Sequence, residues 1–130
     1  MRLWHESLLP LLPRQQLLGQ HRECAALRGL AWGRKHATVD YVFRHSPARL
    51  AAYHLRVMAE MARRGYHADS LWLDPLYRGQ RCRPLSPEYA VECVELMQSA
   101  VPIYPEHDHD YLQACLNNLE QKGIHISCTN

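Results

Sequence analysis

The chain has 130 residues, and its 15 Lys or Arg against 13 Asp or Glu give a formal net charge of +2 at pH 7. This length predicts one domain over residues 1–130, large enough to bury a core without a disulfide or a metal. The apolar content of 47% excludes a disordered chain, and no apolar run is long enough to span a membrane. The small net charge excludes a strongly basic protein but not a nucleic-acid partner, because binding depends on how charge is distributed.

The amino terminus and the cysteines predict a cytoplasmic protein. Residues 1–6 lack the apolar core of a signal peptide and include an early acid, Glu6. The five cysteines are an odd number with no CxxC pair, so we expect reduced thiols. Three of them fall on apolar helix stripes and are expected in the core: Cys24, Cys93 and Cys115.

Helical periodicity dominates the chain and predicts an all-α fold, a single compact bundle of about four helices. The first helix is expected from Arg14 to about Arg28. Its apolar side carries Leu17, Leu18, Cys24 and Ala25, and its polar side carries Gln16, Gln20 and Glu23.

Two Ser-Pro pairs each place a capping hydroxyl before a proline at the first helical position. Ser46-Pro47 begins a second helix, which Gly65 can end. Ser86-Pro87 begins a third helix with the stripe Ala90, Cys93, Val94 and Met97. A last helix is expected from about Asp108 to Lys122. The best strand candidate, residues 37–43, alternates poorly and could equally be helical.

Residues 66–85 form a long irregular loop in the expected fold. Loops of this length are uncommon in compact domains and are often functional. This one carries Trp72, Tyr77, Arg78, Arg81 and Arg83. The alternative is a connector held by a buried Trp72, with its arginines paired to Asp69 and Asp74.

The run Glu106-His107-Asp108-His109-Asp110 contains metal-ligand residue types. Adjacent residues point to different sides of a helix, so this run does not favour three ligands on one ion. Acidic residues just before an apolar stripe are typical of a capped helix start. We therefore expect capping, with no metal and no other cofactor.

Excess positive charge gathers in the first quarter of the chain. Residues 2–36 contain six cations, Arg2, Arg14, Arg22, Arg28, Arg34 and Lys35, against two acids, Glu6 and Glu23. Such a patch suits phosphate contacts, and Trp4, Trp32 and Tyr41 would offer stacking surfaces. The alternative is an ordinary solvated face.

The run from Leu8 to Glu23, LLPLLPRQQLLGQHRE, resembles the amino-terminal segment of the phage-type pyrimidine-dimer DNA glycosylases, also called endonuclease V. Arg22-Glu23 match that family's DNA-binding arginine and catalytic glutamate. Arg34-Lys35-His36 are similar to its Arg-Lys-His stretch. Residues 53–66 resemble its second long helix, and residues 116–122 its last helix, with Lys122 at a basic position that faces DNA. The compact bacterial members that open with Met-Arg-x-Trp-His are the most similar branch.

The resemblance implies a bifunctional DNA glycosylase and apurinic/apyrimidinic lyase that acts on damaged double-stranded DNA, with cyclobutane pyrimidine dimers as its expected lesion. In this family the terminal α-amine attacks the sugar C1′ and forms an imine. The catalytic candidates here are therefore the amine of Met1 or Arg2, and Glu23. The DNA-binding candidates are Gln16, Arg22, Arg34, Lys35, His36, Arg78, Arg81 and Lys122. We expect a nucleoid-associated monomer.

The chain also departs from the family. Arg2 stands where the family has a threonine, and a residue as large as arginine at position 2 normally leaves Met1 in place. Asn118 replaces an arginine of the last helix. The aromatic carboxyl-terminal tail is missing, and the loop at residues 72–83 has no close counterpart. Two alternatives stay open: the same chemistry on abasic sites or other damaged bases, and a DNA-binding or protein-interaction module without catalysis.

Overall fold

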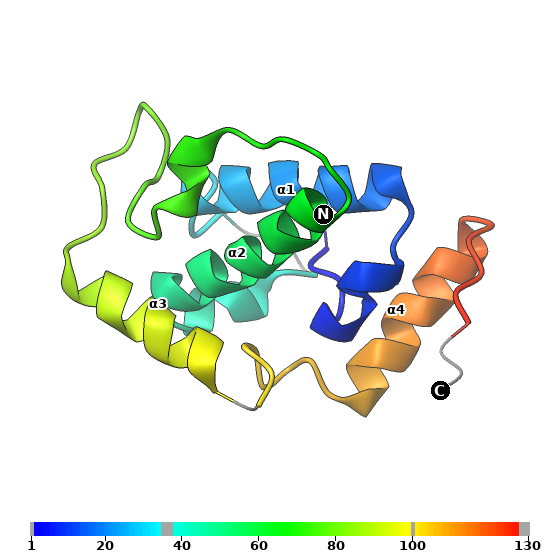
Figure 1. Ribbon diagram of the computed structural model, residues 1–130. Coiled ribbons are helices and arrows are strands. Elements are labelled where there is room, and N and C mark those ends of the chain that lie inside the picture. Colours follow the sequence, from blue (N-terminus) through cyan, green and yellow to red (C-terminus); the bar gives the residue numbers. More distant parts are fainter. Residues whose placement is uncertain (1, 35–37, 100, 128–130) are drawn as a thin grey trace.

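Four α-helices and three short 3-10 helices are joined by irregular segments (Figure 1), as seen in a computed structural model that describes residues 2–34, 38–99 and 101–127. The α-helices are α1 (Arg14–Arg28), α2 (Pro47–Arg63), α3 (Glu88–Gln98) and α4 (His109–Gln121), and the 3-10 helices are η1 (Glu6–Leu11), η2 (Asp40–Arg44) and η3 (Ser70–Leu73). No strand occurs within these ranges, which confirms the all-α prediction. In the strand candidate, residues 40–43 belong to η2, and residue 37 lies outside the described residues.

Local capping chemistry sets the ends of the helices. The Ser46 hydroxyl accepts a hydrogen bond from the Ala48 amide at 3.2 Å, and Gly65 adopts φ +84° just after α2. The Asp108 carboxylate accepts one from the Tyr111 amide at 2.9 Å, which confirms the predicted cap of α4. The start of α3 differs slightly, because Ser86 donates to the side chain of Glu88, the first residue of the helix.

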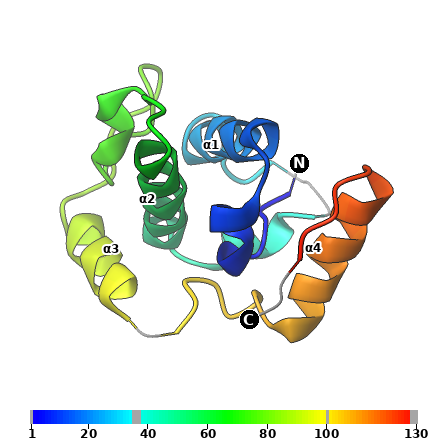
Figure 2. The same ribbon diagram turned by 45° about the vertical axis from the view of Figure 1, so that its right-hand side comes forward.

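The core lies around α2, which packs against both α1 and α3. Cys24, Cys93 and Cys115 are buried, as predicted. The stripe predicted for α3 is wrong at Val94, which is 52% exposed, because α3 covers α2 from one side only. Figure 2 shows the chain start running between α1 and α4. None of the described helices has the length and apolarity needed to cross a bilayer.

Two residues predicted for the polar side of α1 and for the basic patch are instead buried. Gln20 is 1% exposed and Arg28 is 4% exposed, because each binds backbone groups of a segment distant in sequence. Trp4 and Tyr41 belong to the core and are not available as stacking surfaces. Trp32 is partly buried, with its ring edge-on to Phe43.

Candidate active site at the chain start

The first described residues are held by side chains rather than by secondary structure. We call residues 2–4 the chain-start segment. Its backbone groups bond to side chains from α1, α2 and α4, three helices that meet where the chain begins. Chain ends usually fray unless they are tied down, so this arrangement fixes the position of residues 2–4.

Gln20 on α1 makes the most contacts with this segment. Its amide nitrogen donates to the Arg2 carbonyl at 3.0 Å, and its amide oxygen accepts from the Trp4 amide at 2.7 Å. The same nitrogen lies 3.3 Å from Glu23 Oε2. Gln20 therefore couples the backbone of the chain start to the carboxylate of Glu23.

Two tyrosines complete the hold on the segment. The Tyr53 hydroxyl of α2 donates to the Trp4 carbonyl at 2.6 Å, and the Tyr111 hydroxyl of α4 donates to the Leu3 carbonyl. Burial raises the pKa of Tyr53 well above its usual value and that of Tyr111 to about 12. Both hydroxyls therefore stay protonated and can donate at any working pH.

A directed chain of hydrogen bonds supports Tyr111. The Glu6 amide donates to His107 Nδ1 at 3.2 Å, so the neutral tautomer carries its proton on Nε2, which lies 2.8 Å from the Tyr41 hydroxyl. The Tyr41 hydroxyl lies 3.2 Å from that of Tyr111. Burial lowers the pKa of His107 to about 3, which keeps the ring neutral. Each group in this chain thus has one consistent direction of donation.

Glu23 lies directly beside the chain start. The Arg2 nitrogen donates to Glu23 Oε2 at 3.3 Å, across 21 positions of sequence. Glu23 also lines a cavity of about 200 Å³, together with Arg2, Trp4, Thr38, Asn118 and Lys122. The Lys122 ammonium lies 5.3 Å from the centre of the Trp4 ring, a cation–π contact at the edge of this cavity. The cavity therefore combines a carboxylate, cations and the start of the chain.

The other predicted DNA-binding residues lie in several places. Arg22 and Arg34 are exposed, Gln16 is half-buried on α1, and Lys122 lines the cavity from the end of α4. Met1, Lys35 and His36 lie outside the described residues. The structure thus brings Arg2, Glu23 and Lys122 together.

Arg78 and Arg81 lie in the segment between α2 and α3, against the carboxyl end of α1. Arg78 Nε donates to the Arg28 carbonyl at 2.9 Å, and Arg81 is exposed. Trp72 is half-buried, 5.0 Å below the Arg28 guanidinium and edge-on to Tyr77, so it packs the loop onto the bundle. Asp69 and Asp74 accept from the amides of Leu71 and Leu76 and so stabilise turns of this segment.

The acidic run before α4 has structural partners. Glu106 bonds His45 Nε2 at 2.9 Å, His107 is buried in the tyrosine network, and Asp108 caps α4. Within the described ranges, no group of three His, Cys, Asp or Glu side chains is placed to hold a metal ion.

Sequence reasoning missed the residues that hold the chain start. Gln20 was placed on a solvated face, and Tyr53, Tyr111 and His107 had no assigned partner. One signal was present: each is a polar side chain on or beside an apolar stripe, where burial requires a hydrogen-bond partner.

The fold and this site define a class: a small all-α protein that places the second residue of its chain beside a carboxylate in a polar cavity. The family model described as pyrimidine dimer DNA glycosylase matches residues 1–74, which include α1, α2, Glu23 and Gln20. The chain belongs to the pyrimidine dimer DNA glycosylase family, a family of DNA-repair enzymes, and DNA is its substrate. No curated protein and no solved structure matches the chain.

Proposed function

We propose that this protein is a bifunctional glycosylase and lyase that uses its terminal α-amine as the nucleophile on damaged duplex DNA, with pyrimidine dimers as the lesion. The observation that supports this most directly is the hydrogen bond from the Arg2 nitrogen to Glu23 Oε2 at 3.3 Å. A carboxylate fixed beside the chain start is the arrangement that amine catalysis needs.

The covalent step begins when the amine lone pair attacks C1′ of the damaged nucleotide. The electron pair of the glycosidic bond leaves with the base, which takes up a proton. The nitrogen then loses a proton, the C1′–O4′ bond opens with its electron pair going to O4′, which takes up a proton, and a protonated imine joins enzyme and sugar. Loss of a C2′ proton finally expels the 3′ phosphate and breaks the strand.

An α-amine is suited to this task. Its usual pKa is about 7.7–8.0, against about 10.4 for a lysine, so a much larger fraction is unprotonated at neutral pH. Removal of Met1 would turn the Arg2 nitrogen itself into the nucleophile beside Glu23. A retained Met1 would place the amine one residue earlier in the chain.

Glu23 would act on charge and protons around C1′. Its carboxylate can stabilise the positive charge that develops at the sugar as the base departs. It can also accept and return protons during imine formation and elimination. Both roles require a carboxylate close to the amine, and Gln20 supports that proximity by contacting the Arg2 carbonyl and the Glu23 carboxylate.

Cations in this part of the protein would make the contacts with the DNA backbone. Arg22, Arg34, Lys35 and Lys122 suit phosphate contacts, and Gln16 and His36 add polar contacts from the same part of the chain. Arg78 and Arg81 would extend this surface past the end of α1. A nucleotide must leave the stack before an amine can reach its C1′, so these contacts would have to hold a distorted duplex.

Borohydride trapping tests the proposal. The purified protein is mixed with duplex DNA that contains either a pyrimidine dimer or an abasic site, and sodium borohydride reduces any imine to a stable link. We expect a covalent complex on both substrates, and peptide mapping should place the link on the first residue. Binding to both duplexes without trapping would favour the non-catalytic module, and trapping on the abasic site alone would favour the lyase alternative.

A further inference from the structure

We propose that a groove between the carboxyl-terminal half of α1 and the loop at residues 72–82 is a second DNA-backbone site, on one side of the reacting nucleotide. This inference rests on the proposed function for its ligand, duplex DNA. The groove has a volume of about 430 Å³, and we call it the α1–loop groove. Ala26 and Gly29 lie on its floor, and Arg34, Gly79 and Arg81 are among its walls.

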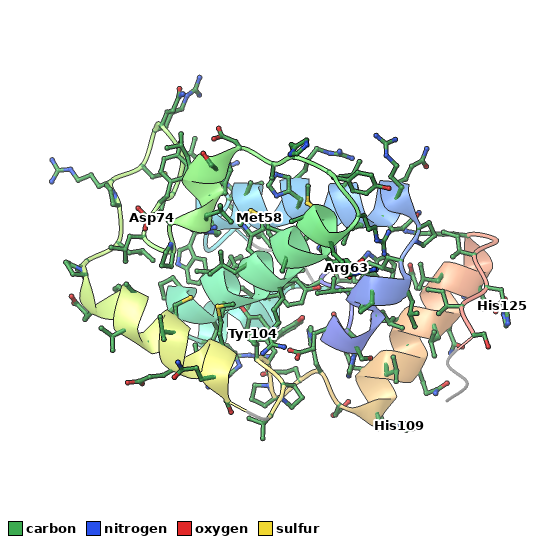
Figure 3. The ribbon with its side chains drawn as sticks, viewed as in Figure 1. Met58, Arg63, Asp74, Tyr104, His109 and His125 are labelled. Carbon is green, nitrogen blue, oxygen red and sulfur yellow. The ribbon has the colours of Figure 1, made fainter. Side chains whose placement is uncertain are left out.

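The loop wall is held rigidly against α1. The buried Arg28 guanidinium donates to the carbonyls of Trp72 at 2.9 Å, Asp74 at 2.7 Å and Tyr77 at 3.0 Å. In return, Arg78 Nε donates to the carbonyl of Arg28 at 2.9 Å. Figure 3 shows Asp74 on the loop at this end of the bundle. The groove is therefore preformed, because its loop is tied to the helix in both directions.

A second network supports Arg28 from the side of α2. Its guanidinium also donates to His54 Nδ1 at 3.0 Å, and His54 Nε2 lies 2.7 Å from His21 Nδ1. Burial lowers the pKa of His54, which keeps Nδ1 free to accept this bond. A loop that served only as a connector would not need a buried arginine that bonds α2, η3 and the loop itself.

The α1 side of the groove is lined mainly by small residues. Ala25, Ala26, Gly29 and Ala31 contribute almost no side chain to it. A Cβ on Gly29 would lie 2.9 Å from the Arg78 carbonyl oxygen, so the loop approaches α1 as closely as it does only because this residue is glycine. Small residues of this kind leave room for a backbone to approach the helix.

The charge of the groove identifies its ligand as an anion. Arg34, Arg78 and Arg81 line it, and the lining that the structure describes contains no Asp or Glu. Arg34 and Arg81 are exposed, so their guanidinium groups can reach a ligand at the rim. Cations on two walls of an open groove with a flat floor suit an extended polyanion, such as the sugar-phosphate backbone of DNA.

The position of the groove relative to Glu23 follows from α1. Arg22, Ala26 and Gly29 are spaced by four and three residues and share one helix face, so the groove continues the surface that begins at Arg22. Gly29 lies six residues beyond Glu23, about 9 Å along the helix at about 1.5 Å per residue. Phosphates of one strand advance about 3.4 Å each along the duplex axis, so a groove about 9 Å away along that axis would meet the backbone about three nucleotides from the reacting one.

The loop also offers a matched control. Arg81 lines the groove, whereas Arg83, which is also exposed and two residues further along, does not. We would compare the wild type with R81Q and R83Q by fluorescence anisotropy on an abasic-site duplex over a series of salt concentrations. We expect R81Q to weaken binding several-fold and to reduce the slope of log affinity against log salt by about 0.9. We expect R83Q to match the wild type, and equal thermal melting would show that all three proteins are folded.

Uncharged methylphosphonate linkages locate the contact. Each duplex carries one such linkage at a different distance from the abasic site, on either side. A linkage about three nucleotides away, on one side only, should weaken wild-type binding several-fold and leave R81Q binding unchanged. Equal effects of R81Q and R83Q, or no linkage whose effect depends on Arg81, would overturn the second site.

Borohydride trapping of the same proteins separates this result from the proposed function. If the wild type is trapped normally while R81Q and R83Q bind alike, the groove is wrong and the amine mechanism stands. If R81Q alone loses affinity while no protein is trapped, the groove binds DNA and the amine mechanism fails.

Discussion

Acid should destabilise this protein through His107, and the size of the effect can be worked out from its surroundings. The ring is buried, its Nδ1 accepts the Glu6 amide, and its pKa is about 3, against 6.5 for a free histidine. The unfolded chain therefore binds a proton here at a pH where the folded protein does not. Stability is full above about pH 6.5 and falls as the pH drops from there toward about 3.

The loss follows from the difference between the two pKa values. Between about pH 7.5 and 5.0, a shift from 6.5 to 3 removes about 2 kcal/mol from the free energy of unfolding. Burial also lowers the pKa of His5, His21 and His54, so the wild type should lose more than His107 alone contributes. A variant that cannot titrate at position 107 isolates the contribution of that ring.

The variant H107Q suits this purpose, because a glutamine oxygen can accept the Glu6 amide and its nitrogen can donate to Tyr41. Urea unfolding of both proteins at pH 7.5 and 5.0 gives the four free energies required. We expect H107Q to be less stable at pH 7.5, since it loses the ring stacked on Tyr111 at 4.8 Å, but to lose about 2 kcal/mol less on acidification. The same pH dependence in both proteins, or an NMR titration of His107 near 6.5, would refute this account of the buried ring.

Four further predictions concern the site and the loop. E23Q should keep DNA binding and lose borohydride trapping by about 10²–10⁴ in rate, because removal of an acid–base group costs about that much, while E95Q, on the exposed side of α3, should behave as the wild type. Q20L should be trapped more slowly while its binding constant for an abasic duplex and its urea midpoint stay those of the wild type, a split that a general loss of stability would not produce; an unchanged trapping rate would contradict a positioning role. A short extension before residue 1 should abolish trapping and leave the binding constant for an abasic duplex unchanged, and trapping through the extended terminus would count against the amine mechanism. R28K should release the loop, because an ammonium cannot hold three carbonyls as the guanidinium fork does, so trypsin should cut after Arg78 and Arg81 faster than in the wild type.

The sequence predicted the features whose causes are local. The Ser46 and Asp108 caps and the Gly65 turn each depend on residues within a few positions, so the starts and ends of α2 and α4 could be predicted closely. The predicted limits of α1 agree with the structure for the same reason.

The features that depend on distant partners could not be predicted in this way. The sequence prediction puts Gln20 on the polar side of α1 and Arg28 in a basic patch, and both inferences hold only where a polar group faces water. Gln20 is buried because its amide bonds the chain start, and Arg28 because its guanidinium bonds a loop more than forty residues later. Glu23 became a candidate through the family resemblance, and only the fold shows that the Arg2 nitrogen lies beside it.

The way the chain start is held also explains how one side chain could control it. Fixing the backbone of three residues costs about 1–2 kcal/mol each, or about 3–6 kcal/mol in total. The segment makes five backbone hydrogen bonds to side chains, each worth about 0.5–1.5 kcal/mol, or about 5 kcal/mol together. These two quantities nearly cancel, so the net hold on the segment comes from the burial of Leu3 and Trp4 in the core. Gln20 takes part in two of the five bonds, and its loss should therefore loosen the backbone of Arg2 beside Glu23 while Leu3, Trp4 and the core remain packed.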